Sequence, residues 1–122
     1  MTLPWRPPGH CIRWARGVCC ETGWILETQP MNRITLDSDK QVMRVGAGAT
    51  WREIIPVLHA RGYAPKVMQS NHDFTIGGSL SVNCHGWHTN SPPTASTVQS
   101  LRLLTADSTV VTGSRTAQPV RE

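Results

Sequence analysis

A helical repeat of apolar residues is the clearest pattern in the chain. Four apolar side chains follow the i, i+3, i+4, i+7 spacing of an amphipathic helix: Trp51, Ile54, Ile55 and Leu58. This spacing predicts a helix with one buried face. Thr50 precedes the repeat and Glu53 stands three residues later, which is the sequence of a capping box and places the start of the helix.

The sequence also predicts where this helix ends, and it contains one conflict. Gly62 is the expected stop, because glycine readily adopts the left-handed conformation that closes a helix. Pro56 conflicts with the pattern, since a proline in a helix interior costs about 3 kcal/mol. We keep the helix and expect a kink or a late start.

Short strands and turns are predicted before the helix. The apolar run at residues 24–26 indicates a buried strand that ends by Pro30. Residues 31–36 form a connection or a short strand, and residues 37–39 are a turn signal. Residues 41–45 alternate between polar and apolar, which predicts a half-buried strand.

A hairpin is predicted after the helix. Residues 97–105 and 109–112 have strand character, and the turn sequence Ala-Asp-Ser at 106–108 joins them. Residues 113–122 show no clear element. Short strands combined with one capped helix place the chain in the α+β class.

Composition divides the chain into three segments. Residues 1–21 combine three prolines with tryptophans, arginines and cysteines, and they show neither a helical nor a strand period. We predict an irregular segment there, a single domain over residues 22–115 and a tail at residues 116–122. A chain of 122 residues is long enough for one domain with one modest core.

Charge and hydropathy argue against two classes of partner. The net charge is +4, but the Lys and Arg residues are scattered, which argues against a nucleic-acid partner. No apolar run is long enough to span a membrane. No secretory signal is visible at the N-terminus, which favours the cytoplasm.

The four cysteines do not form a metal-binding pattern. Cys19 and Cys20 are adjacent, while Cys11 and Cys84 complete no Cys-x-x-Cys pair. Adding the nearby histidines gives no spacing typical of zinc ligands. We therefore expect free thiols in a reducing compartment and no metal.

The stretch at residues 73–86 has the composition of a ligand-binding loop. Gly77 and Gly78 have no side chain, so a ligand can approach their backbone amides closely. If Thr75 caps a short helical turn there, its hydroxyl and these amides converge on one point. This arrangement suits an anionic group such as a phosphate.

Gly46 and Gly48, just before the predicted helix, allow two interpretations. One is a nucleotide-binding loop, and the other is a tight turn between a strand and a helix. We prefer the tight turn, because Gly-x-Gly alone is a common sequence.

The order of these motifs resembles a known cofactor-binding domain. A strand leads to Gly-Ala-Gly-Ala-Thr-Trp at residues 46–51, and then come a helix and a glycine. Three further motifs follow in order: Thr-Ile-Gly-Gly at residues 75–78, His-Gly-Trp at residues 85–87 and Ser-Leu-x-Leu-x-Thr-Ala-Asp from residue 100. This order resembles the FAD-binding domain of the vanillyl-alcohol oxidase family, also called the PCMH-type domain. The resemblance runs from about Gly23 to Arg115, and its most specific part lies between Thr75 and Gly86.

The resemblance implies FAD as the cofactor and assigns roles along the loop. The pyrophosphate and ribityl chain would be held by Ser70, Asn71, Thr75, Ile76, Gly77 and Gly78. The site would continue toward the flavin ring along Ser81, Val82, Asn83, His85 and Gly86. His85 would be the candidate catalytic residue near the isoalloxazine, although a His before a Gly is by itself more often structural. Asp73 is expected to form an Asx turn rather than to act as a base.

The resemblance also implies an activity. Members of the family transfer a hydride from an alcohol- or sugar-like substrate to flavin N5, and the cofactor supplies that chemistry. We predict the FAD-binding portion of a flavin-dependent oxidoreductase, not active alone, with a small-molecule substrate in the complete protein. The alternative is a non-catalytic, anion-binding or degenerate domain of the same fold.

The sequence departs from the family pattern at its start. The first glycine-rich phosphate loop of the family has only an echo in Gly9, His10 and Cys11, so no covalent flavin link is assigned to His10. The strands before that loop and the substrate-binding domain have no counterpart in these 122 residues. We therefore expect a partial PCMH-type domain, that is, a fragment.

Overall fold

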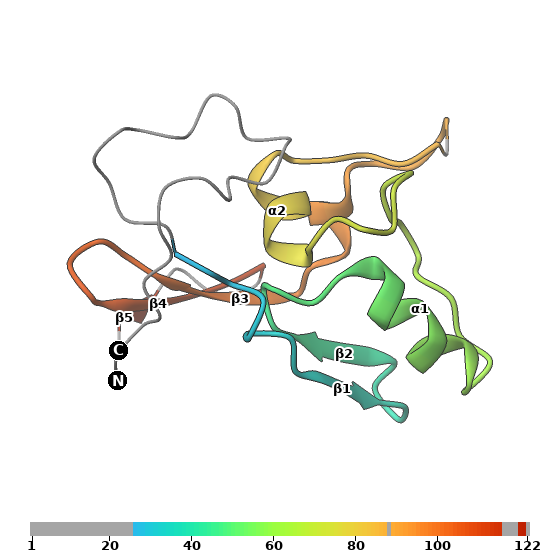
Figure 1. Cartoon of the computed structure of the whole chain (residues 1–122), viewed down its shortest axis with the longest axis horizontal. Coiled ribbons are helices and arrows are strands. Elements are labelled where there is room, and N and C mark those ends of the chain that lie inside the picture. Colours follow the sequence, from blue (N-terminus) through green and yellow to red (C-terminus); the bar gives the residue numbers. More distant parts are fainter. Residues whose placement is uncertain (1–25, 88, 116–119, 122) are drawn as a thin grey trace.

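Two small antiparallel sheets and two short α-helices make up the part of the chain that the structure describes. In this computed structural model, that part comprises residues 26–87, 89–115 and 120–121, with side chains described up to residue 115. The elements follow the order β1 (Ile34–Asp37), β2 (Val42–Val45), α1 (Trp51–His59), α2 (Ile76–Ser81), the 3-10 turn η1 (Thr94–Thr97), β3 (Ser100–Leu104), β4 (Val110–Ser114) and β5 (Val120–Arg121) (Figure 1). This combination of helices and antiparallel strands is α+β, as predicted.

The antiparallel ribbon of β1 and β2 closes through the predicted turn. The Asp37 carboxylate accepts a hydrogen bond from the backbone amide of Lys40 at 3.1 Å, and it pairs with the Lys40 ammonium at 3.5 Å. Gln41 completes the turn with a φ of 51°. The turn and the strand predicted at residues 41–45 are therefore confirmed, and of the two alternatives for residues 31–36 the short strand holds from Ile34 onward.

Helix α1 begins where the capping box places it. The Thr50 hydroxyl accepts a hydrogen bond from the Glu53 amide at 3.3 Å, and the Glu53 carboxylate accepts one from the Thr50 amide at 2.8 Å. Each side chain thus satisfies a backbone donor that the first helical turn leaves without an intrahelical partner. The local sequence therefore predicts this end of the helix, and carbonyls of the loop before α2 accept hydrogen bonds from its first two amides.

Pro56 lies inside α1 without delaying its start. The helix begins at Trp51, so the expected late start is wrong and the kink stays a prediction. At the other end, Gly62 has a φ of 73°, and the amide of Tyr63 donates to the carbonyl of Leu58 at 3.0 Å. This is the hydrogen-bond pattern of a Schellman motif, which confirms Gly62 as the stop.

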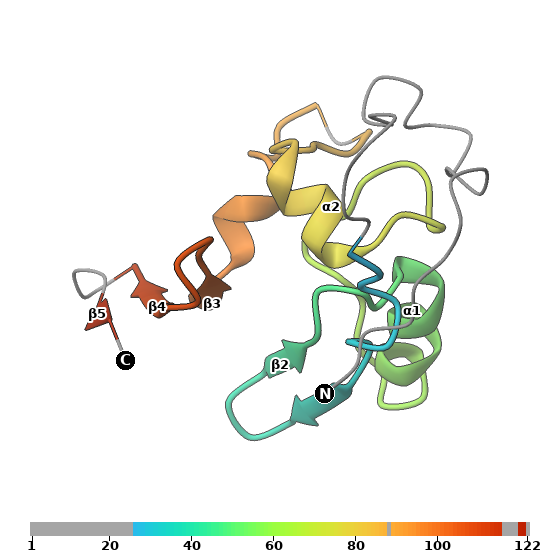
Figure 2. The ribbon, with the colours of Figure 1, turned by 60° about the vertical axis from the view of Figure 1, so that its left-hand side comes forward.

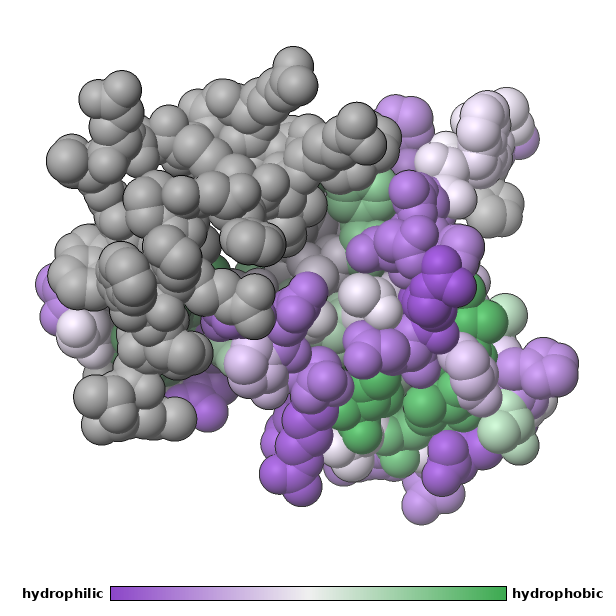
Figure 3. Space-filling view, in the orientation of Figure 1, coloured by the Kyte–Doolittle hydropathy of each residue, from purple (hydrophilic) through white to green (hydrophobic). Residues whose placement is uncertain are grey.

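The core lies between α1 and one face of the β1–β2 ribbon. Ile54 is fully buried at its centre, with Trp51 and Leu58 buried on either side. Half-buried apolar side chains from the ribbon, from the loop after α1 and from α2 pack around them: Ile34, Leu36, Met43, Val45, Tyr63, Met68 and Ile76. The register pairs the four ribbon residues of this set across the two strands, so they share one face. Figure 3 shows apolar side chains reaching the surface near α1 and the ribbon, bordered by hydrophilic ones.

Replacing Glu53 by glutamine is expected to lower the melting temperature at pH 7, and to lower it less as the pH falls. The backbone amide of Thr50 donates to the Glu53 carboxylate and lowers the pKa of that carboxyl in the folded protein. A carboxyl with a lowered folded-state pKa stabilises the fold above its unfolded pKa, and this contribution is lost as the pH falls through the folded pKa. Melting curves recorded from pH 7 to pH 3 should therefore converge for wild type and variant.

The control for this prediction is Asp39→Asn, which removes the same charge from an exposed turn residue. It is expected to leave the melting temperature at pH 7 nearly unchanged. A difference between wild type and Glu53→Gln that stays constant down to pH 3 would contradict the ionised cap.

The second sheet has the strand order β3, β4, β5. β3 and β4 pair in antiparallel fashion, with Leu103 opposite Val111, and β5 pairs with the other edge of β4. In Figure 2 this sheet stands to one side of α2. The predicted hairpin is confirmed, but β3 begins at Ser100 rather than at residue 97, because the 3-10 turn η1 includes residue 97 and residues 98–99 lie in neither a helix nor a strand. β5 also corrects the prediction of no element after residue 112.

Several predictions fall on residues outside the described part of the chain. They concern the irregular segment at residues 1–21, including Gly9, His10 and three of the cysteines, and the first two residues of the strand expected at residues 24–26. Leu26, the described member of that strand, is exposed and lies in no strand. The prediction is wrong at Leu26, because no described segment pairs with it to form a sheet and cover its side chain.

Candidate functional site

The glycine-rich loop folds into the short helix that the sequence predicted. Thr75 is the N-cap of α2, and its hydroxyl accepts a hydrogen bond from the amide of Gly78 at 3.1 Å. Ile76 is half-buried against the core, while Gly78 is exposed. The predicted cap is therefore confirmed, and it starts a helix of six residues.

The first amides of α2 already have acceptors within the protein. The amide of Ile76 donates to the carbonyl of Ala49 at 2.8 Å, and the amide of Gly77 donates to the carbonyl of Ala47 at 2.8 Å. With the Gly78 amide bonded to the cap, the predicted convergence of these donors on an anion is wrong. The start of α2 therefore does not fit the role of a ready-made cradle for the FAD pyrophosphate.

Gly46 and Gly48 are explained by packing inside the protein. A Cβ on Gly46 would lie 2.0 Å from the carbonyl oxygen of Met31, and a Cβ on Gly48 would lie 1.8 Å from that of Thr28. The Gly48 amide also donates to the Met31 carbonyl at 2.9 Å. The segment before β1 thus lies directly against this turn, which favours the tight-turn interpretation over the nucleotide loop.

The residues that lead into α2 form a polar surface loop. The side chain of Asn71 accepts a hydrogen bond from the amide of Asp73 at 2.9 Å, so the Asx turn belongs to Asn71. The Asp73 carboxylate instead accepts hydrogen bonds from the Arg52 guanidinium on α1, at 2.8 Å from Nε. The expectation that Asp73 forms the Asx turn is therefore wrong, because its side chain turns toward this cation. Ser70 is exposed beside the loop.

The second half of the predicted site continues beyond the end of α2. Ser81 donates its hydroxyl to the carbonyl of Gly77 at 2.8 Å, and Val82 is 73% exposed. Asn83 has a φ of 48°, which turns the chain sharply. His85 is exposed, and its Nδ1 lies 3.1 Å from the carbonyl oxygen of the next residue, Gly86. These residues are contiguous and accessible, so they could contact a bound molecule.

Sequence reasoning missed two residues that fix α2 in place. Ser79 is 1% exposed; its hydroxyl donates to the Thr75 carbonyl at 2.8 Å and accepts a hydrogen bond from the indole of Trp51 at 3.1 Å. Ala47 accepts from the Gly77 amide, as described above. No local pattern marks either residue, because the partner that ties each one across the fold, Trp51 for Ser79 and Gly77 for Ala47, is far away in the sequence.

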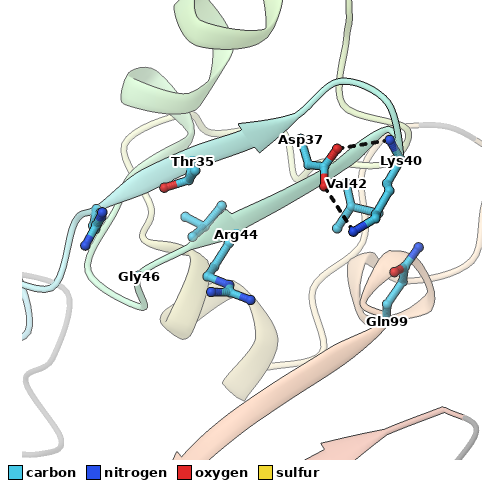
Figure 4. A pocket seen from close by; sticks show the side chains of 9 residues that line it. Thr35, Asp37, Lys40, Val42, Arg44, Gly46 and Gln99 are labelled. Atoms are coloured by element: carbon cyan, nitrogen blue, oxygen red, sulfur yellow. Dashed lines mark hydrogen bonds and ion pairs between the residues drawn. The ribbon is translucent and has the colours of Figure 1, made fainter.

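A separate hollow opens on the outer face of the β1–β2 ribbon. It has a volume of about 680 Å³ and is lined by Arg33, Thr35, Asp37, Lys40, Val42, Arg44, Val45, Gly46 and Gln99 (Figure 4). None of the predicted FAD contacts lines it. The hollow is therefore distinct from the loop that the sequence singled out.

The remaining site predictions concern metals, thiols and membranes. Among the described residues, no group of three potential ligands could hold a metal ion. Cys84 is a free thiol, as expected. No helix in the described ranges is long and apolar enough to cross a membrane.

Comparison with known proteins identifies the family. A family described as "FAD binding domain" matches residues 2–114, so the chain belongs to this family of flavoproteins. FAD is the cofactor of this domain, and the resemblance to FAD-linked oxidases is confirmed. The family implies a PCMH-type fold, and the two small antiparallel sheets with few helices are consistent with part of one.

The relatives are FAD-linked oxidases and are much longer than this chain. An alditol oxidase from Streptomyces sp. is 33% identical over 76 residues, which is 62% of this chain and 18% of the relative. L-gulonolactone oxidases from Mus musculus and Bos taurus are each 28% identical over 95 residues, or 77% of this chain and 22% of theirs. The chain therefore spans less than a quarter of the length of these relatives. No solved structure matches it significantly.

Proposed function

We propose that the chain is the FAD-binding portion of a flavin-dependent oxidoreductase. The complete protein would transfer a hydride from an alcohol- or sugar-like substrate to flavin N5, and FAD supplies the hydride acceptor when bound. The observation that carries the proposal is the family match over residues 2–114. The relatives, an alditol oxidase and two L-gulonolactone oxidases, support the substrate class.

The proposed FAD contacts follow the loop and α2 in two sets. The first set would lie along the pyrophosphate and ribityl chain: Ser70, Asn71, Thr75, Ile76, Gly77 and Gly78. Because the amides of Ile76, Gly77 and Gly78 are bonded within the protein, these three residues would contribute close approach of the backbone rather than free donors. The second set, toward the flavin ring, is Ser81, Val82, Asn83, His85 and Gly86. The exposure of Val82 and His85 supports the second set, because both side chains are open to a ligand. His85 would lie near the ring and orient the flavin or the substrate.

The chain by itself is expected to bind FAD weakly and to turn over no substrate. Its first α2 amides are bonded to protein carbonyls, so they add little to the binding of a diphosphate. The sequence also spans less than a quarter of the relatives' length.

Flavin fluorescence tests this expectation. Titration of 1 μM FAD with the purified chain should give gradual quenching without a stoichiometric break. A sharp break at one equivalent would contradict weak binding and show that the chain completes a cofactor site alone. No change in fluorescence at any concentration, together with unchanged amide shifts by NMR, would instead favour the alternative of a non-catalytic or degenerate domain.

A further inference from the structure

The start of α2 is fastened to the turn between β2 and α1. The amides of Ile76 and Gly77 donate to the carbonyls of Ala49 and Ala47, each at 2.8 Å, and Thr75 forms an isolated β-bridge with the residue that caps α1. Ala49 is fully buried and Ala47 is half-buried, so water competes little for these bonds. The position of α2 therefore depends on contacts made by its first turn.

The two glycines of the motif have different surroundings. A Cβ built on Gly77 would lie 3.0 Å from both the Cβ and the carbonyl oxygen of Ala47. Real Cβ atoms rarely have contacts this short, so Ala47 would have to give way by a few tenths of an ångström, and its backbone carbonyl moves only with its peptide. Among the described residues, a Cβ on Gly78 would meet the Thr75 hydroxyl at 3.1 Å, a side-chain atom that can shift more easily than a backbone carbonyl, and Gly78 is exposed. Gly77 is thus the more confined of the two glycines, because a backbone atom is among its close neighbours.

We propose that Gly77 is a positioning residue, whose amide and missing side chain lock α2 onto the turn at residues 46–49. Of the glycine pair, only Gly78 is then left open toward the cofactor. This inference rests on the proposed function, because it assigns separate roles to two of the proposed FAD contacts. The sequence motif suggested a phosphate-binding loop. Its first glycine, Gly77, instead attaches α2 to the turn at residues 46–49.

The attachment of α2 to this turn matters for the cofactor, because the position of α2 sets the position of the segment that follows it. Ser79 is held by Trp51 on the inner side of α2, and Ser81 is bonded back to Gly77. The residues from Val82 to Gly86 leave from this fixed end. A displacement of the first turn would therefore move the proposed flavin-facing segment as a unit.

The test compares Gly77→Ala with Gly78→Ala, the same chemical change one residue later. Gly77→Ala is expected to lower the melting temperature by roughly 5 °C or more, whereas Gly78→Ala leaves it unchanged or slightly raised, as alanine favours helix. At 10 °C, where circular dichroism confirms folding, FAD is titrated and amide shifts of residues 81–86 are followed. The FAD dissociation constant of folded Gly77→Ala should rise at least fivefold relative to wild type. Adding Ala47→Gly to this variant should recover part of the lost melting temperature and part of the lost FAD affinity.

Each result decides a part of the proposal. An unchanged melting temperature for Gly77→Ala, or rapid hydrogen exchange of the Gly77 amide in the free protein, would overturn the packing role. A wild-type dissociation constant in folded Gly77→Ala would overturn the positioning role and leave a merely structural residue. If wild type shows no shifts with FAD, the proposed function fails and the positioning role with it, while the melting temperatures still decide the packing role.

Discussion

Gly48→Ala is expected to lower the free energy of unfolding by about 3 kcal/mol or more, because the added methyl group has no space. Gly48 is buried, and a Cβ there would lie 1.8 Å from the carbonyl oxygen of Thr28 and 3.0 Å from the Cα of Gln29. Both neighbours are backbone atoms, so no side chain can rotate away. The segment before β1 must move, and the hydrogen bond from the Gly48 amide to Met31 must break or bend.

Urea unfolding followed by circular dichroism measures this loss. Gly113→Ala in β4 is the matched control, because no atom of the described residues beyond its chain neighbours lies within 4 Å of a Cβ at that position. The control is expected to change the free energy of unfolding by about 0.5 kcal/mol or less. Equal effects of the two substitutions would contradict the close contact between the turn and the segment before β1.

Ile54→Ala is expected to lower the free energy of unfolding by about 2–5 kcal/mol. Ile54 is 0% exposed and lies at the centre of the α1 face, between Trp51 and Leu58. Truncation removes buried apolar surface and leaves a cavity, because the capped helix and the paired ribbon hold the surrounding residues apart. The buried set in the described part of the chain is small, so this loss is a large share of the total stability.

Ile55→Ala is the control, since it makes the same change in the same helix at a half-buried position. It is expected to cost less than half as much as Ile54→Ala when both are measured by urea unfolding. Similar losses would mean that the apolar face of α1 is not oriented as described. Because both variants keep a good helix former, the comparison separates packing from helix propensity.

The local elements of the fold could be predicted where one stretch of sequence contains both partners. The capping box needs only Thr50 and Glu53, and the stop at Gly62 needs only a glycine after the last apolar residue. The helical spacing likewise identified Ile54 and Leu58 as buried. Sequence could not predict β5, because that strand exists only through its pairing with β4.

The candidate site was predicted less completely than the fold. The role of Thr75 as a cap follows from the residues after it, and the structure confirms it. The side chain of Asp73 could equally have formed an Asx turn, and only the approach of Arg52 from α1 decided otherwise. A polar residue in a loop has several possible partners, and the tertiary contacts select one of them.

The sequence by itself determined the family, the cofactor class and the local structures whose hydrogen bonds close within a few residues. Only the tertiary structure decided which donors of the glycine motif remain for a ligand. The carbonyls of Ala47 and Ala49 take the first amides of α2 although they precede α1 in the chain. A backbone donor is satisfied by whichever acceptor the fold brings to it, and no local pattern of residues encodes that neighbour.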